Sequence, residues 1–453
     1  MPISLSPPGR PARPVAHWWT RAASASALLL VLAAPGRAEQ PSPNAAAAAV
    51  LAQAAVLAPA AAPAAAARQY TLTELIEGAR AGSPAAATSR AGEDLASAGI
   101  RTARARPNPE LSLEPGRLRP RGGAEGDGSS TLLSVGLPIE NPWLRTSRIR
   151  AAEAAVDVAR ARTETVQADL VAAIRIRFFE IVRLEEAVAA FQEDLQLTEQ
   201  ILERIRLQVR TGEAPRFDLV RAEGETAVAR KNLENAQMRL LSVKADLRRL
   251  TGPWVAPEFG IRLEPEDQRP LDEEDYRRYA QAIERANPQI ALARAELEQA
   301  QRRVERERNA VLPQVTLRAS QERDPSFTLN RIGAQVTLPL IDRREGPIAE
   351  AQAQVAVARL ALEQRRHEAS AELDAAWRAY RAALVRVESL AGGIIERART
   401  TVDIAEAAYR FGERGILEFL DAQRQFRLVR NELISARNEL RLARTDLERI
   451  AGR

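Results

Sequence analysis

The chain contains one structural pattern twice, at an offset of about 200 residues. Residues 210–213 (RTGE) return as 410–413 (RFGE), and residues 250–252 (LTG) return as 450–452 (IAG). These and other matches keep the same order along the chain, which chance in an alanine-rich sequence does not produce. A period this long indicates a duplicated unit of several secondary-structure elements rather than a solenoid of short repeats.

Each copy of the pattern reads as a helix, two extended segments, a very long helix and a shorter helix. Apolar residues lie three and four positions apart in the helical segments. A helix of about 65 residues is roughly 100 Å long, and helices of that length normally pack as coiled coils. Taken alone, the pattern is typical of a structural coiled-coil protein. The helices are expected at 72–105 (with a candidate break at Pro84), 146–210 and 217–250, and again at 271–310, 348–410 and 416–450.

The extended segments alternate apolar and polar residues and read as two β-hairpins. The first has strands at 109–116 and 131–139 around a glycine-rich turn at 121–130, and the second has strands at 313–321 and 327–340. About 9–11 such residues cross a bilayer as a tilted strand, but four strands cannot close a barrel. Either the hairpins form small soluble sheets, or three copies pool their strands into a membrane barrel. The expected membrane-facing residues are Leu111, Leu113, Leu133, Val135, Leu137, Val315, Leu317, Val336 and Leu338.

The N-terminus has the features of an export signal. Residues 1–38 contain four arginines and no acid, and an apolar run at 22–34 precedes the small residues at 36–38. The run has thirteen residues, whereas a transmembrane helix needs about 20. The sequence therefore predicts a signal peptide at 1–38, a flexible Ala/Pro-rich lead-in at 39–68, a first repeat at 69–252, a linker at 253–270 and a second repeat at 271–453.

Composition excludes several classes of function. Outside residues 1–38 the chain has 61 basic and 60 acidic residues with no dense basic patch, so nucleic-acid binding is not expected. The absence of Cys excludes disulfides, thiolate metal sites and an acylated N-terminal Cys. The histidines are His17 and His367, and no glycine-rich phosphate loop precedes a Lys. The sequence predicts no enzyme site, no cofactor and no metal site.

The order of elements, together with a few motifs, resembles the TolC-like family of outer-membrane efflux proteins. The motifs are residues 338–342 (LPLID), and residues 409–412 (YRFG) followed by 417–423 (LEFLDAQ). Residues 106–111 (RPNPEL) and the LPLID motif are most similar to the cobalt–zinc–cadmium branch of the family. The resemblance covers essentially all of residues 70–452.

The resemblance implies a mostly α-helical protein with a membrane β-barrel part. Three copies would form a twelve-stranded barrel in the outer membrane of a Gram-negative bacterium and a coiled-coil tunnel across the periplasm. The homotrimer would contact outer-membrane lipid, a periplasmic adaptor (membrane fusion protein) and an inner-membrane resistance–nodulation–division pump. With no Cys, a lipid anchor is not expected. The implied function is passive export of divalent heavy-metal cations; the alternatives are a conduit for drugs or type I protein secretion, and a secreted coiled-coil protein without a pore.

The resemblance also assigns roles to residues at the two turns that join the long helices. Glu418 and Asp421, three positions apart on one helix face, correspond to carboxylates that ring a closed aperture at the periplasmic end. Asp218 and Arg414 correspond to an ion pair that joins neighbouring turns. From the residues alone, the same charges are typical of a solvated helix face. The expected adaptor contacts are Thr211, Gly212, Glu213, Phe411, Gly412 and Glu413.

Overall fold

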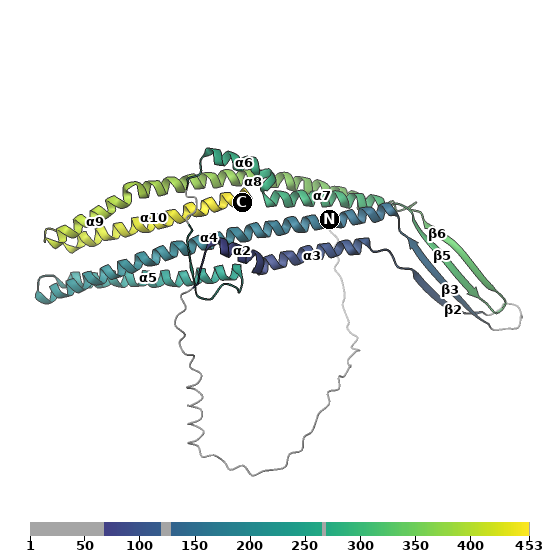
Figure 1. Ribbon diagram of the computed structural model, residues 1–453, viewed down its shortest axis with the longest axis horizontal. Helices are drawn as coiled ribbons and strands as arrows, with labels where there is room; N and C mark the ends of the chain where they lie inside the picture. Colours follow the sequence, from purple (N-terminus) through teal and green to yellow (C-terminus); the bar gives the residue numbers. More distant parts are fainter. Residues whose placement is uncertain (1–67, 119–127, 265–268, 453) are drawn as a thin grey trace, which may run out of the picture. The chain divides into compact units, whose positions relative to one another are not determined.

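The computed structural model describes residues 68–118, 128–264 and 269–452, and the two copies of the pattern fold alike (Figure 1). The predicted signal peptide, the lead-in up to residue 67 and most of the glycine-rich turn lie outside the described residues. The first copy contains α2 (Leu72–Gly82), α3 (Pro84–Arg104), β2 (Glu110–Leu118), β3 (Gly128–Ile139), α4 (Pro142–Thr211) and α5 (Arg216–Thr251). The second contains α6 (Glu273–Ala286), α7 (Pro288–Asn309), β5 (Gln314–Arg323), β6 (Thr328–Thr337), α8 (Glu345–Ser389), the π-helical segment η1 (Leu390–Ile394), α9 (Ile395–Arg410) and α10 (Ile416–Ile450).

Each copy begins with a helix that is broken before a proline. Pro84 and Pro288 occupy the first turn of α3 and α7, where a missing backbone N–H costs nothing. The residue before each proline is extended, as the proline ring requires, with ψ of 136° at Ser83 and 119° at Asn287. The predicted break at Pro84 is therefore present, and the second copy repeats it.

The last helix of each copy ends in contact with the backbone at this helix break. Gly252 and Gly452 follow the last helices with φ of +105° and +75°, and a Cβ at either position would meet the backbone carbonyl of Gly82 or Ala286. In the second copy the side chain of Asn287 also donates a 3.0 Å hydrogen bond to the carbonyl of Ile450. Only glycine fits such an approach, so the recurring glycine at 252 and 452 closes the repeat.

The expectation of one unbroken helix over 348–410 is wrong. In the second copy η1 separates α8 from α9, and Gly393 has a φ of +138° that L-residues rarely adopt. The corresponding helix of the first copy, α4, runs for 70 residues without interruption. Two consecutive glycines, Gly392 and Gly393, permit the break because a left-handed conformation costs glycine no steric energy.

The four long strands form one antiparallel sheet in the order β2-β3-β5-β6. Cross-strand partners share a face, and the register places apolar residues of all four strands together, as in the row Leu111, Val135, Ala319 and Ile332. The opposite face carries Ser112, Ser134, Ser320 and Arg331 in one row. The sheet therefore has an apolar face, which is solvent-exposed in a single chain, and a polar face.

The fourth strand ends earlier than expected, and one of the predicted membrane-facing residues lies just beyond it. β6 ends at Thr337, so Leu338 lies beyond the strand, where its side chain is 58% exposed. Pro339 follows directly and cannot donate to a strand ladder, which explains the early end of the predicted strand at 327–340. Across residues 68–118, 128–264 and 269–452, none of the helices combines the length and hydrophobicity that a bilayer-spanning helix needs.

The residues between the two repeats contribute to the core of the first one. β4 (Phe259–Ile261) pairs in parallel with β1 (Arg68–Tyr70), and the side chains of Val255 and Phe259 are buried against Tyr70, with Phe178 of α4 in the same cluster. Trp254 stands edge-on to Tyr70, with ring centroids 5.4 Å apart. Residues 254–261 of the predicted linker are thus held to the first repeat by aromatic and apolar packing.

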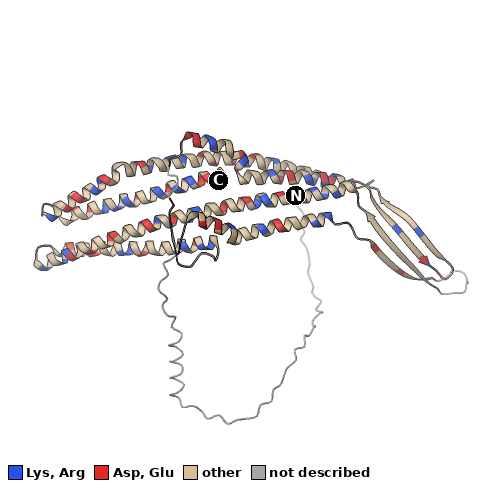
Figure 2. Cartoon of the chain, viewed as in Figure 1, with Lys and Arg blue, Asp and Glu red and all other residues tan. Residues whose placement is uncertain are grey.

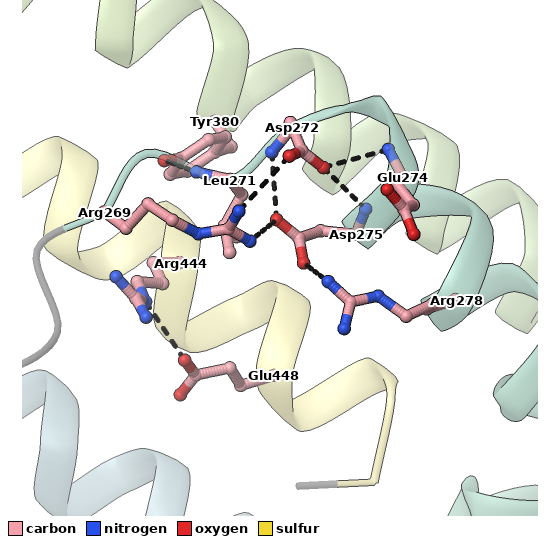
Figure 3. A network of polar contacts seen from close by, with 9 residues as sticks. All are labelled: Arg269, Leu271, Asp272, Glu274, Asp275, Arg278, Tyr380, Arg444 and Glu448. Carbon is pink, nitrogen blue, oxygen red and sulfur yellow. Dashed lines mark hydrogen bonds and ion pairs between the residues drawn. The ribbon is translucent and has the colours of Figure 1, made fainter.

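A polar network fixes the start of α6 within the second repeat (Figure 3). Asp275 accepts hydrogen bonds from the side chains of Arg269 and Arg278, and Asp272 caps the helix by accepting from the backbone N–H of Asp275. The hydroxyl of Tyr380 on α8 accepts from the N–H of Leu271 at 2.9 Å. Asp272 and Asp275 together form a capping box, which satisfies the free N–H groups of the first turn.

Candidate functional site

The turns that join α4 to α5 and α9 to α10 have the same backbone geometry, and we call them the first tip (residues 211–216) and the second tip (residues 411–416). Gly212 has a φ of +82° and Gly412 a φ of +72°. The N–H of Glu213 donates to the carbonyl of Gln208 at 2.8 Å, and the second tip forms the matching bond at 2.9 Å. This is a helix ending that requires a left-handed residue, so both glycines are needed by the fold itself.

The predicted adaptor-contact residues all lie at the surface of the tips. The side chain of Phe411 is 82% exposed, whereas large aromatic side chains are usually at least partly buried. Its counterpart in the first tip is Thr211, whose hydroxyl donates to the carbonyl of Gln208 at 3.0 Å. The remaining exposed positions of this set are Gly212, Glu213, Gly412 and Glu413.

The two tips pack against each other through a contact that the sequence did not predict. The hydroxyl of Tyr409 on α9 donates to Oε1 of Gln208 on α4 at 3.1 Å, and the Tyr409 ring stacks on Phe419 of α10 with centroids 6.0 Å apart. Burial raises the pKa of the Tyr409 phenol, and the charge of Arg204 partly opposes this shift. Tyr409 takes the place of Val209 of the first repeat, and this difference between the copies is the signal that could have found the contact.

Glu418 and Asp421 lie on the exposed face of α10. Phe419 and Leu420, which lie between them in sequence, are buried in a cluster with Ile205 of α4 and Ala222 of α5. Glu418 and Asp421 line one groove of about 820 Å³, together with residues of α9, α10 and α5. The structure therefore brings the two predicted aperture carboxylates together on one helix face.

The other two predicted residues, Asp218 and Arg414, do not form the expected ion pair in the described part of the chain. Nη1 of Arg414, in the second tip just before α10, forms an ion pair with Oε2 of Glu418 in the first turn of α10 at 2.6 Å. Among the described residues Arg414 forms no ion pair with Asp218, which lies in the first turn of α5. The groove is instead lined from α5 by Arg221, one turn further on, which the sequence did not single out.

A buried ion pair joins the two repeats between the tips and the sheet. Oδ2 of Asp194 on α4 lies 2.7 Å from Nη2 of Arg430 on α10, and this nitrogen also donates to the carbonyl of Ala190 at 3.0 Å. Burial raises the pKa of Asp194, while Arg430 opposes the shift. The pair holds α10 to α4, the helices that carry the second and the first tip.

Over the described ranges no group of three or more His, Cys, Asp or Glu side chains could hold a metal ion. The groove along α10 carries the carboxylates of Glu418 and Asp421 and the guanidinium groups of Arg221 and Arg414.

Comparison with known proteins extends over most of the chain. The family model described as outer membrane efflux protein matches residues 75–253 and 279–453. The cobalt-zinc-cadmium resistance protein CzcC of Cupriavidus metallidurans is 27% identical over 367 residues, which cover 80% of this chain and 84% of that protein.

Two solved structures have the same fold. The crystal structure of CusC gives a TM-score of 0.72 at 17% identity and covers 84% of this chain and 92% of its own. The outer membrane protein VceC of Vibrio cholerae gives a TM-score of 0.69 at 19% identity, with coverage of 84% and 96%. The fold class expected from the sequence, a duplicated helix–hairpin–long helix–helix unit, is confirmed.

Proposed function

The chain belongs to the outer membrane efflux protein family, and we propose that three copies form the outer-membrane channel of a tripartite system that exports divalent heavy-metal cations. In this proposal the channel is a passive conduit. A periplasmic adaptor contacts the tips, and an inner-membrane pump supplies the energy.

The observation that carries the proposal is the four-stranded sheet with one apolar and one polar face. In the described residues β2 and β6 form the edges of the sheet, and each has a strand on one side only. Open edges leave backbone groups unpaired, which lipid does not tolerate. Pairing β6 of one copy with β2 of the next satisfies both edges, and three copies then close a ring of twelve strands. The strands have 9, 12, 10 and 10 residues, which suits the width of a bilayer.

The metal cargo is supported by the relative whose name refers to cobalt, zinc and cadmium resistance. The carboxylates Glu418 and Asp421 are compatible with cation passage, and three copies would bring six of them to the periplasmic entrance. A groove of this kind gives preference for charge sign but little discrimination among divalent metals. Selection of the metal is therefore assigned to the pump.

The cargo is tested by deleting the gene and measuring growth on zinc, cobalt, cadmium, nickel, copper and silver, and on dyes, detergents and antibiotics. Sensitivity to metals alone, restored by the wild-type gene, is the expected result. Sensitivity to dyes and antibiotics would move the cargo to drugs. Unchanged growth on all compounds would contradict metal export as the main role and turn attention to protein secretion.

The membrane sheet is tested by two substitutions on β6. Ile332, in the middle of β6, lies on the apolar face and Gln335 on the polar face, and both side chains are exposed in a single chain. Ile332→Arg should abolish assembly in the outer membrane, because an arginine facing lipid costs about 2–4 kcal/mol near the bilayer midplane. Gln335→Arg, which adds the same charge to the polar face, should assemble normally. Equal behaviour of the two variants would contradict a lipid-facing sheet.

A further inference from the structure

The sheet and the helices meet in one layer, which side-chain contacts hold together. Nε of Arg148 on α4 donates to the carbonyl of Ala103 on α3 at 2.9 Å. Nη2 of Arg344, just before α8, lies 2.6 Å from Oε2 of Glu307 on α7. The ends of α3 and α7 and the starts of α4 and α8 therefore lie at one level. We call this layer the collar and define it by residues 101–110, 140–153, 298–313 and 338–350.

The collar is rich in arginine. Its segments contain twelve arginines and nine carboxylates, and Figure 2 shows basic residues where the helices approach the strands. The carboxylates without an ion pair are Glu110, Asp342, Glu345 and Glu350, and Asp342 accepts a hydrogen bond from the backbone N–H of Arg344. Six arginines are exposed and form no ion pair or side-chain hydrogen bond in the described part of the chain: Arg101, Arg106, Arg150, Arg303, Arg308 and Arg343.

Five large apolar side chains stand exposed in the same layer, and three of them are exposed by more than 60%. Ile341 is 100% exposed, Leu340 71% and Trp143 67%. Trp143 follows the end of β3 by four residues, and its carbonyl accepts a 3.5 Å hydrogen bond from the side chain of Asn309 at the end of α7. Leu340 and Ile341 follow the end of β6 in the same way. These apolar side chains therefore lie on the segments that lead from β3 and β6 to the arginines.

We propose that the collar binds anionic phospholipid headgroups at the periplasmic surface of the membrane. Arg106, Arg308 and Arg343 contact lipid phosphates, and Trp143, Leu340 and Ile341 lie among the upper parts of the acyl chains. The inference rests on the proposed function, because it requires the sheet to lie in a bilayer.

Two physical arguments support a lipid surface as the partner. The guanidinium group forms paired hydrogen bonds with phosphate oxygens, and arginines without carboxylate partners remain available for them. Tryptophan favours the boundary between hydrocarbon and headgroups, where its ring is apolar and its N–H is hydrated. Charged and apolar groups at one level match the headgroup layer, which adds roughly 5–8 Å on each side of the hydrocarbon core.

Trp143 supplies a direct reporter of lipid contact. The full chain is reconstituted in vesicles of equal parts phosphatidylcholine and phosphatidylglycerol, in which one lipid at a time carries bromine atoms near the headgroup end of its acyl chains. Bromine quenches tryptophan fluorescence on contact. Subtracting the quenching of Trp143→Phe isolates the signal of Trp143 from that of the other four tryptophans, Trp18, Trp19, Trp254 and Trp377. We expect brominated phosphatidylglycerol to quench Trp143 at least twice as strongly as brominated phosphatidylcholine.

The charge dependence is tested by the triple variant Arg106→Gln, Arg308→Gln and Arg343→Gln, in which the quenching ratio should fall to one. The matched control removes three exposed arginines far from the collar, by Arg239→Gln, Arg277→Gln and Arg381→Gln, and should keep the ratio. Both triple variants lose the same charge, so a nonspecific effect of net charge would move them equally.

Three results would overturn the inference. Equal quenching by both lipids in the wild-type chain would remove the preference for anionic headgroups. Absence of Trp143 quenching in vesicles that conduct ions would show that another copy or another protein covers the collar. If the wild-type protein neither floats with the vesicles nor makes them conduct ions, the proposed membrane channel is wrong. The collar proposal, which depends on the channel, then fails with it.

Discussion

Nη1 of Arg414 lies 2.6 Å from Oε2 of Glu418, so the first predicted aperture carboxylate is paired with an arginine of the second tip, just before its own helix. Asp421, in the same groove, forms no ion pair or side-chain hydrogen bond within the described residues. The two carboxylates are therefore not equivalent. Because the pair is exposed to solvent, its effect on stability is small, and its consequence is the local charge of the groove.

The first prediction concerns the charge of the groove. Asp421→Asn and Glu418→Gln should each lower the cation preference of the resting channel by about two-fold or more, because each removes one negative charge and the second also leaves the charge of Arg414 uncompensated. Arg414→Ala should raise the preference. Reversal potentials across a planar bilayer, measured under a gradient of dilute salt, report this preference with little screening. An unchanged preference in both carboxylate variants would contradict the prediction.

The second prediction concerns the contact between the tips. Tyr409→Phe keeps the stack on Phe419 but removes the donor to Gln208, and should lower the free energy of unfolding by about 0.5–1.5 kcal/mol. A double-mutant cycle with Gln208→Ala isolates the interaction, since the second substitution should cost little once the first is present. Strictly additive effects would show that the hydrogen bond does not contribute.

The third prediction concerns the glycines of the tips. Gly212→Ala and Gly412→Ala should each cost roughly 1–2 kcal/mol, because an L-residue is strained at these positive φ values. Gly224 in α5 is the control, since its backbone has no positive φ and a Cβ there meets no atom. Gly224→Ala should stabilise the helix by up to about 1 kcal/mol. Chemical denaturation of the three variants gives the comparison, and the same sign at all three positions would refute the argument.

The sequence predicted the elements of the fold well because their signals are local or periodic. Pro84 marks a helix break, the alternation of the strands marks two faces, and Gly212 and Gly412 mark the tips. The break at Gly392 and Gly393 was missed because the apolar spacing on either side continues the same helical pattern. Two adjacent glycines were the available signal.

The candidate site was less predictable, because pairing of charges depends on three-dimensional packing. Arg414 has a carboxylate four positions away in sequence, and this spacing indicates the observed pair with Glu418. The family pattern instead suggested Asp218, a partner across tips. The contact of Tyr409 with Gln208 joins residues 201 positions apart, and no local signal specifies it.

The fourth prediction concerns pH and Glu307 in the collar. Burial raises the pKa of this carboxyl, but hydrogen bonds from Arg344 and Arg306 outweigh burial and hold the pKa below its ordinary value of 4.5. A lowered pKa in the folded state stabilises the fold above pH 4.5, and this contribution is lost as the pH falls through the folded-state pKa. Glu307→Gln should therefore destabilise the protein at neutral pH and lose its effect in acid.

Thermal unfolding of the Glu307→Gln variant at neutral and acidic pH measures this loss. The control is Glu350→Gln, at an exposed collar position without an ion pair, which should change the midpoint little at either pH. A midpoint difference for Glu307→Gln that is independent of pH would mean that the two arginines do not stabilise the ionised carboxyl.

The last prediction concerns the break between α8 and α9. Gly393 has a φ of +138°, so Gly393→Ala introduces strain of about 1–3 kcal/mol unless the backbone straightens toward the continuous helix seen in α4. Gly392 has ordinary angles and open space at the Cβ position, so Gly392→Ala should be tolerated. Straightening would displace α9 and with it the second tip, because a change of angle in mid-helix is carried to the helix end. Gly393→Ala should therefore lower stability and alter the resting conductance, whereas Gly392→Ala should alter neither. If both variants leave conductance unchanged while Gly393→Ala lowers stability, the break shapes the helix without setting the position of the tip.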